Sequence, residues 1–200
     1  MPRTIAIITA GGTGKRMKSS VYKQFIQIQG IPILAITIKQ FELNPEIDGI
    51  IITSPGDALY QTAEDIVDRF QFKKVLKIVE GGSERQFSVW NALKATPGDT
   101  EFVLIHDGVR PFVSQKFLDR IIQTGYEKGA CIPALKPSET VKQIADHQIK
   151  STLDRDSLIL VQTPQMFRMS EIREAYEKAD LTTQHFTDDS AVMEKLNSVP

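Results

Sequence analysis

The chain contains little that would suggest a disulfide, a membrane or a nucleic-acid partner. It holds a single cysteine, Cys131, which excludes an intramolecular disulfide and is most simply a small buried apolar residue. The net charge of -1 provides no basic surplus for nucleic acid or an anionic membrane. The apolar runs are far shorter than a membrane span, and no signal-like segment opens the chain. We therefore expect a soluble, cytoplasmic protein with neither partner.

The remaining composition suits one globular domain over residues 1–200, since 41% of the residues are hydrophobic. Apolar runs rich in Ile and Val alternate with segments of helical periodicity. Strands are predicted at 5–8, 49–53, 75–79, 102–105 and 130–134, and helices at 33–41, 58–70, 84–95, 115–128 and 171–178. This alternation predicts an α/β fold with a mainly parallel sheet and helices on both faces. Ser114 and Ser170 stand where helix N-caps belong.

The segment at about 136–156 departs from this alternation. Residues 140–144 and 149–153 are half-polar, and a polar turn lies between them at 145–148. The pattern predicts a β-hairpin arm that projects from the sheet. Two such strands are marginally stable alone, so something should cover their apolar side, and a second subunit is one such cover.

The strand that opens the chain leads directly into a glycine-rich loop with the sequence AGGTGKRM at 10–17. Its glycines let backbone N–H groups approach an anion, while Lys15, Arg16 and the nearby Lys23 supply charge for a triphosphate. A P-loop is excluded because Arg16 follows Lys15, and a dinucleotide fingerprint because position 17 is Met. The alternative is a β-α turn whose basic residues are merely solvated.

Polar residues follow two other predicted strands. Asp107 ends the fourth strand, at the sheet edge where ligands bind in such folds, and is our candidate for holding Mg²⁺ together with substrate phosphates. Alternatively Asp107 caps the following turn; for His106 we favour a core residue whose hydrogen bonds are satisfied.

A glycine pair follows the third strand. Gly82 permits close backbone approach, and the hydroxyl of Ser88 could face the edge of a base. An alternative, compatible with this one, is a turn followed by a helix whose N-cap is Ser83.

These segments belong to a larger series of motifs that occur in order along nearly the whole chain. The series is AGGTGKRM at 10–17, KQ at 23–24, GGSER at 81–85, HDGVRP at 106–111, Thr140, DR at 154–155, QTPQMF at 162–167 and TDD at 187–189. Together they resemble the 2-C-methyl-D-erythritol 4-phosphate cytidylyltransferase family.

The resemblance implies a Rossmann-like nucleotidyltransferase fold, transfer of CMP from CTP to a polyol phosphate with release of pyrophosphate, and Mg²⁺ as cofactor. Arg16 and Lys23 match the catalytic residues that neutralise charge at the α-phosphate. The loop and the resemblance together predict nucleotide binding by Ala10, Gly11, Gly12, Thr13, Gly14, Lys15, Gly82 and Ser88. The predicted substrate-binding residues are Asp107, which is also the metal candidate, Arg110, Thr140, Arg155 and Thr163.

The resemblance also implies a homodimer in which the arm carries Thr140 and Arg155 to the partner's active site. Without it, Arg155 would be expected to form an ion pair with Asp154 or Asp156 at the base of the hairpin. The alternatives to the implied activity are a cytidylyltransferase acting on ribitol 5-phosphate and a paralogue that binds CTP without turnover.

The chain departs from the family pattern in four places. Tyr22 stands where proline is usual, which predicts a less fixed segment around Lys23. Glu139 replaces aspartate and Gly108 replaces alanine, both mild changes. The family continues beyond position 200 into a segment with an Asn-Ile-Lys motif, so the resemblance implies that the natural C-terminal end is missing.

Overall fold

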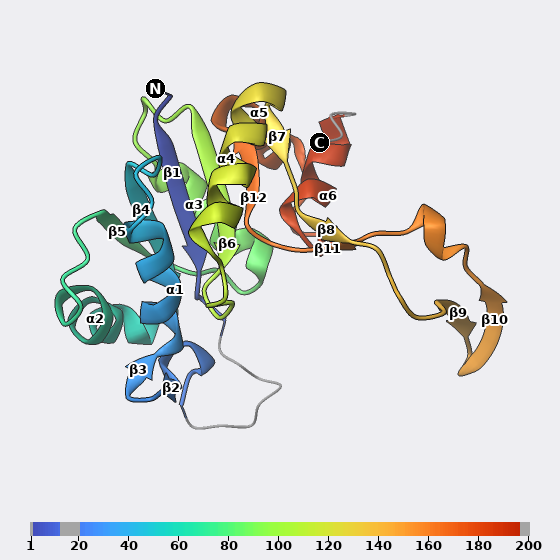
Figure 1. The fold of residues 1–200 in the computed structure, drawn as a ribbon, viewed down its shortest axis with the longest axis horizontal. Helices are drawn as coiled ribbons and strands as arrows, with labels where there is room; N and C mark the ends of the chain where they lie inside the picture. Colours follow the sequence, from blue (N-terminus) through green and yellow to red (C-terminus); the bar gives the residue numbers. More distant parts are fainter. Residues whose placement is uncertain (1, 13–20, 197–200) are drawn as a thin grey trace.

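The fold is known from a computed structural model that describes residues 2–12 and 21–196. Its centre is a six-stranded sheet with the strand order β5-β4-β1-β6-β12-β7 (Figure 1). The strands are β1 (Thr4–Thr9), β4 (Gly49–Ser54), β5 (Val75–Glu80), β6 (Phe102–Asp107), β7 (Ala130–Cys131) and β12 (Gln165–Arg168). Strands β5, β4, β1 and β6 are parallel, and β12 runs antiparallel to both of its neighbours. The predicted mainly parallel sheet is confirmed.

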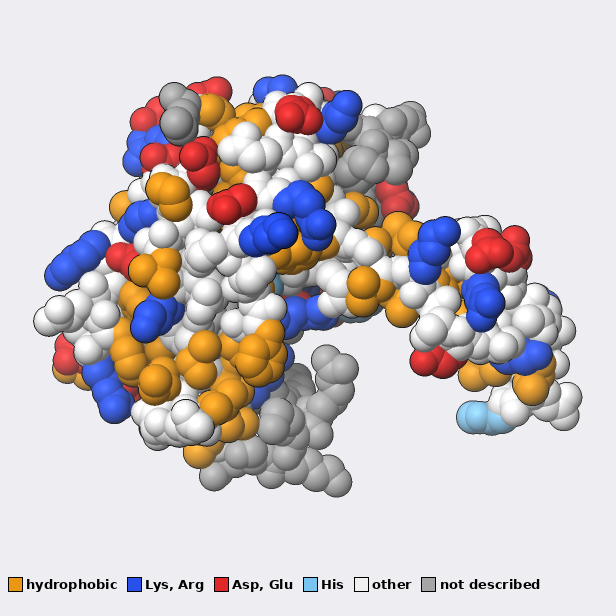
Figure 2. Space-filling model, viewed as in Figure 1, with side chains coloured by type: hydrophobic (Ala, Val, Ile, Leu, Met, Phe, Trp, Pro, Cys, Tyr) orange, Lys and Arg blue, Asp and Glu red, His pale blue; other side chains and the backbone are white. Residues whose placement is uncertain are grey.

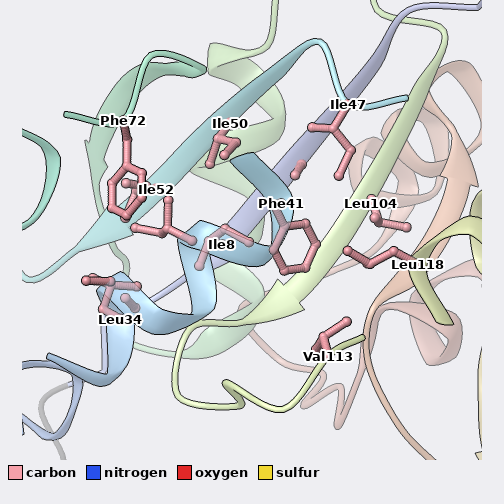
Figure 3. Close-up of a cluster of buried hydrophobic side chains, with 14 of the residues drawn as sticks. Ile8, Leu34, Phe41, Ile47, Ile50, Ile52, Phe72, Leu104, Val113 and Leu118 are labelled. Carbon is pink, nitrogen blue, oxygen red and sulfur yellow. The ribbon is translucent and has the colours of Figure 1, made fainter. Parts of the chain in front are cut away.

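Helices cover both faces of this sheet. They are α1 (Ile33–Glu42), α2 (Leu59–Thr62) with its π-helical continuation Ala63–Asp68, α3 (Arg85–Ala95), α4 (Gln115–Lys128), α5 (Met169–Lys178) and α6 (Asp189–Met193). Alternate residues of β1 belong to two cores: Ile8 packs with α1 and α4, and Ile7 packs with α3, α5 and α6. Figure 3 shows the first core, with Phe41 of α1 and Leu118 of α4 directed toward Ile8. In the part of the chain described, none of the helices combines the length and apolarity that crossing a bilayer requires.

Some predicted element ends differ from the structure. Ser114 caps α4 by accepting a hydrogen bond from the Phe117 N–H at 3.2 Å, as predicted. The caps predicted at Ser170 and Ser83 are wrong, because α5 already begins at Met169 and the N-cap of α3 is Glu84.

The predicted strand at 130–134 is in fact two short strands on either side of Pro133, which cannot donate to a ladder. The first is β7, and the second is β8 (Ala134–Leu135), which pairs with β11 (Leu160–Val161). Short 3₁₀ helices lie at Lys23–Phe25, Gly56–Ala58, Arg155–Ser157 and Glu194–Leu196, and a small hairpin joins β2 (Gln27–Ile28) to β3 (Ile31–Pro32).

The predicted arm is a β-hairpin that stands away from the body (Figures 1 and 2). Strands β9 (Lys142–Ala145) and β10 (Gln148–Thr152) are joined by Asp146 and His147, whose φ angles of 49° and 62° are those of a type I′ turn. Ile144 and Ile149 face each other across the two strands and are 67% and 68% exposed. The apolar side of the arm is therefore uncovered within this single chain.

Candidate active site

The candidate site lies at the edge of the sheet where the parallel strands end. Thr9 of β1 is in register with Thr53 of β4 on one side and with Asp107 of β6 on the other. The residues that follow β1 therefore emerge between these two polar side chains. This is the edge at which open α/β sheets bind ligands.

The backbone of the glycine-rich loop is anchored where it leaves β1. The N–H groups of Ala10 and Gly11 donate to the hydroxyl of Thr53 at 3.1 and 3.2 Å, and the Ala10 carbonyl accepts from the side-chain amide of Gln24 at 2.7 Å. Gln24 and Ala10 are both buried. Because these backbone groups have partners within the protein, the start of the loop is held in place independently of any ligand.

The predicted base-recognition residues come together beside this loop. A Cβ atom on Gly11 would lie 2.9 Å from the Gly81 Cα and 3.1 Å from the Ser88 Oγ, so any side chain there would close the gap. The Ser88 hydroxyl donates to the Glu84 carbonyl at 3.1 Å and accepts from the Gly82 N–H at 3.0 Å. Ser88 thus fixes the loop that carries Gly82.

Lys23 lies next to the same loop, since a Cβ atom on Gly12 would be 3.8 Å from the Lys23 Nζ. Tyr22, which stands where the family pattern has proline, donates its hydroxyl to Asp57 at 2.6 Å and packs its ring edge-on against Phe25. The segment carrying Lys23 therefore has an anchor that proline could not provide. The predicted loop residues Thr13, Gly14, Lys15 and Arg16 lie outside the described residues.

Asp107 forms the centre of a second group of charges. Its Oδ1 accepts from the Arg85 Nε at 3.2 Å, and its Oδ2 pairs with the Arg110 Nε at 2.9 Å. Arg85 also donates to Asp189 at 2.8 Å, and the fully buried Asp189 accepts from the hydroxyl of Tyr176 at 2.8 Å. Burial alone would raise the pKa of Asp107, but the two guanidinium groups hold the pKa of this carboxyl below its usual value. The carboxylate pairs with arginines and does not cap the following turn.

His106 and Thr163 complete this side of the site. His106 is fully buried, and its ring nitrogens lie 3.0 Å from the Arg110 carbonyl oxygen and 2.9 Å from the Thr163 Oγ1. The expected core residue with satisfied hydrogen bonds is confirmed. A cavity of about 380 Å³ opens beside these groups, lined in part by Arg110, Gln162 and Thr163. The structure therefore brings together Asp107, Arg110 and Thr163.

Thr140 and Arg155, by contrast, lie on the arm side of the molecule. The Arg155 Nη1 donates to the Ser138 carbonyl at 2.9 Å across the base of the arm. Asp154 instead accepts from the Asp156 N–H, so the ion pair considered for Arg155 is not formed among the described residues.

The sequence also matches a known family as a whole. The family model of 2-C-methyl-D-erythritol 4-phosphate cytidylyltransferase matches residues 4–200. The chain belongs to this family. A 2-C-methyl-D-erythritol 4-phosphate cytidylyltransferase of Geobacter metallireducens is 44% identical over 194 residues, which are 96% of this chain and 84% of that relative. One from Syntrophus aciditrophicus is 42% identical over 196 residues, 98% of this chain and 84% of the relative.

A solved structure agrees with this membership. The 4-diphosphocytidyl-2C-methyl-D-erythritol synthase of Anaerococcus prevotii is similar to this chain with a TM-score of 0.84 and 33% identity, covering 98% of this chain and 84% of that one. The Rossmann-like fold predicted from the resemblance to the cytidylyltransferase family is confirmed.

Several residues of this cytidylyltransferase site had no role in the sequence-based prediction. Arg85 and Asp189 stood inside the quoted motifs, but nothing in the sequence indicated that residues 104 positions apart would pair. Thr53 is a polar residue near the carboxyl end of the buried strand β4, the same signal that pointed to Asp107, and could have been found in that way. Gln24 directly follows Lys23, and the prediction gave a role only to the charged Lys23.

The Mg²⁺ expected for a cytidylyltransferase can be tested against the donor set. The structure, within the residues that it describes, contains no group of three or more His, Cys, Asp or Glu side chains that could hold a metal. Both oxygens of Asp107 accept from arginines, and Arg85 is held in place by Asp189 while Arg110 is half exposed. The single carboxylate of Asp107 fits a cation that is also bound by substrate phosphates, provided that the Arg110 guanidinium moves away from this carboxylate.

Proposed function

We propose that the chain transfers CMP from CTP to 2-C-methyl-D-erythritol 4-phosphate in the synthesis of isoprenoid precursors. A phosphate oxygen of the acceptor forms a bond to the α-phosphorus of CTP, the bond from that phosphorus to the β-phosphate oxygen breaks, and pyrophosphate leaves. One observation carries the proposal: in a member of this family, one sheet edge brings the close approach of Gly11 and Ser88 together with the cluster of Asp107, Arg110 and Thr163.

The proposed reaction requires positive charge and correct positioning of the substrates more than it requires a general base. The attacking phosphate monoester is already anionic, so the barrier lies in aligning two anions and in holding the charge that develops at the α-phosphate. Lys23 and Arg16 are the proposed groups for that charge. Lys23 is supported by its place 3.8 Å from the position of a Cβ on Gly12, at the start of the phosphate-binding loop.

The nucleotide is proposed to bind through the glycine-rich loop at 10–15, Gly82 and Ser88. Mg²⁺, when bound, would neutralise charge on the phosphate oxygens, and Asp107 would hold it together with those oxygens. Arg110 would then turn from Asp107 toward the acceptor, which its partial exposure permits.

The acceptor's phosphate is proposed to bind to Thr140 and Arg155 of a second subunit in a homodimer. Two observations support this. The arm stands away from its own body, and Ile144 and Ile149 on its surface are exposed as a facing pair. A covered apolar pair is the usual state, so a partner chain accounts for both features.

The test is pyrophosphate release from CTP and Mg²⁺, with 2-C-methyl-D-erythritol 4-phosphate and ribitol 5-phosphate offered separately. We expect release with the first acceptor alone and none when Mg²⁺ is left out. Release with ribitol 5-phosphate alone would replace the proposed acceptor. CTP binding without release to either acceptor would indicate a paralogue that only binds the nucleotide.

A further inference from the structure

The buried ring of His106 has no part in the proposed chemistry, although it lies directly beneath the acceptor side of the site. Both ring nitrogens make a polar contact: the Nε2 is 3.0 Å from the Arg110 carbonyl oxygen, and the Nδ1 is 2.9 Å from the Thr163 Oγ1. The ring packs against Phe41 with 5.1 Å between centroids, so it cannot turn over without disturbing the core.

The partners of the ring determine where its hydrogen lies. A carbonyl oxygen can only accept, so the Nε2 must carry the hydrogen and donate it to Arg110. The ring is completely buried, and Arg110 and Arg85 lie nearby, so a second N–H with its positive charge is disfavoured despite the neighbouring Asp107. A neutral imidazole has one N–H group, and the Nδ1 is therefore a bare acceptor.

This leaves Thr163 with its hydroxyl hydrogen committed to His106. One lone pair of the Thr163 oxygen lies 3.4 Å from the Asp107 N–H, a long and weak contact. What Thr163 presents to the adjoining cavity is then an acceptor, in a wall that also includes Arg110. A hydroxyl oxygen that can only accept matches the O–H group of an alcohol.

We propose that His106 is a positioning residue which fixes the Thr163 hydroxyl as a hydrogen-bond acceptor, so that Thr163 takes an alcohol group of the acceptor substrate. The inference rests on the proposed function for the identity of that substrate. By holding the Arg110 carbonyl, His106 also fixes the turn whose guanidinium pairs with Asp107. The direction of one hydrogen thus determines which kind of group Thr163 can bind.

The first experiment reads the position of the hydrogen without turnover. In ¹⁵N NMR of the full chain with labelled histidine, we expect His106 to carry hydrogen on Nε2 and none on Nδ1 at neutral pH. His106→Gln identifies its signals among those of the three histidines. Thr163→Val should shift the Nδ1 signal, whereas Thr163→Ser, which keeps the hydroxyl, should leave it nearly in place. Hydrogen on Nδ1, or no response to Thr163→Val, would overturn the proposal.

The second experiment compares two replacements of the ring by their kinetics. The amide of His106→Gln can still reach the Arg110 carbonyl but leaves Thr163 free, whereas the amide of His106→Asn can reach Thr163 and releases Arg110. We expect His106→Gln to raise KM for the acceptor about tenfold with little change in KM for CTP, as for one lost hydrogen bond of defined direction. His106→Asn should instead lower kcat, because Arg110 is no longer held.

Coupling to Thr163 separates this role from a general loss of packing. When Thr163 is already replaced by Val, a further His106→Gln change should leave KM for the acceptor unchanged. Acceptor analogues that lack one hydroxyl should have a kcat/KM about tenfold below that of the full acceptor with the original chain, and no such loss with the Thr163→Val variant. Equal losses for CTP and acceptor, or simple additivity, would overturn the proposal. If His106→Gln does not fold, Thr163→Val against Thr163→Ser gives the same comparison.

The two proposals fail in different ways. An original chain that releases pyrophosphate with the methylerythritol substrate, yet shows none of these couplings, would overturn the role of His106 alone. A chain that shows no release would overturn the proposed function, and the NMR measurement would still decide the state of His106 and Thr163.

Discussion

The body of this molecule is built on buried strands, whereas the strands of its arm are exposed. Strand β1 (Thr4–Thr9) is buried along nearly its whole length and contributes to a core on each face of the sheet, whereas β9 (Lys142–Ala145) is exposed at every position. The body is stabilised by its own apolar contacts, in the way that small domains usually are. The arm has only its hairpin ladder and a type I′ turn, so its position depends on what it packs against.

The candidate site is divided along the same line. Arg85 and Asp189 hold Asp107 from within the body, and these groups are placed before any ligand binds. The positions of Thr140 and Arg155 relative to Asp107 depend on where the arm lies. The difference suggests that changes in the body alter the rate or the fold, whereas changes in the arm alter how one substrate is held.

The largest effect is expected within the body, where two phenylalanines outside the arm test how far its stability depends on burial. Phe167 is fully buried in the body, whereas Phe112 is 95% exposed. Phe167→Ala should lower the free energy of unfolding by about 3–5 kcal/mol, because it leaves a cavity in the core. Phe112→Ala should change it by less than about 0.5 kcal/mol. Urea unfolding, followed by the fluorescence of the single tryptophan, Trp90, measures both; similar losses would contradict the dependence of the body on buried apolar contacts.

The next test concerns charge in the body. Lys23→Ala should lower kcat by about a hundredfold to a thousandfold with only a modest change in CTP affinity, because the charge is needed most as it develops at the α-phosphate. Pyrophosphate release and calorimetric CTP binding measure the two quantities. Lys39→Ala, on the exposed side of α1, serves as the control and should leave both unchanged. An unchanged kcat in Lys23→Ala would remove Lys23 from its proposed role.

The third test addresses the arm. Arg155→Ala should raise KM for the polyol phosphate by about tenfold and leave CTP binding alone, as expected for one charged hydrogen bond to a phosphate. Lys150→Ala removes a different exposed positive charge from the same arm and should have little effect. If Arg155→Ala weakens CTP binding instead, the arm belongs to the nucleotide side.

The smallest effect on stability is expected at the apolar side of the arm, where we propose that a second subunit binds. Ile149→Ser should change the free energy of unfolding by less than about 0.5 kcal/mol, since the side chain is already exposed in the single chain. It should nevertheless raise the concentration at which a dimer dissociates, which sedimentation velocity measures. Leu43→Ser replaces a residue of similar exposure, 60%, on the body. Equal dissociation of both variants would exclude the arm as the interface.

The sequence predicted the parts of the fold that local pattern controls. The apolar runs located β1, β4, β5 and β6, and the polar turn at 145–148 located the arm, because strand and turn signals lie within a few residues of each other. Strand β12 was missed, since Gln165–Arg168 is too short to show a period and lies within a motif. Its antiparallel place between β6 and β7 is set by tertiary packing.

The candidate site was predictable to a similar degree. Asp107 was found because a carboxylate at the end of a buried strand is unusual, and the grouping with Arg110 and Thr163 followed from the family resemblance. The pairing of Arg85 with Asp189 could not be found, because no sequence period connects residues so far apart. Even local features such as N-caps were not fully predictable from the sequence. Ser83 and Ser170 were both plausible caps, but the helices have Glu84 and Arg168 at these positions.

The pairing of the partly buried Arg85 with Asp189 has a consequence for how the protein is made. Arg85 leaves the ribosome long before Asp189, its partner 104 residues later. Until then, the growing chain can form the parallel strands β1, β4, β5 and β6, but the guanidinium lacks the fully buried carboxylate that compensates for its removal from water. The segment that carries Asp189 therefore completes this part of the candidate site, and a polypeptide interrupted before Asp189 is expected to leave Arg85 without that partner.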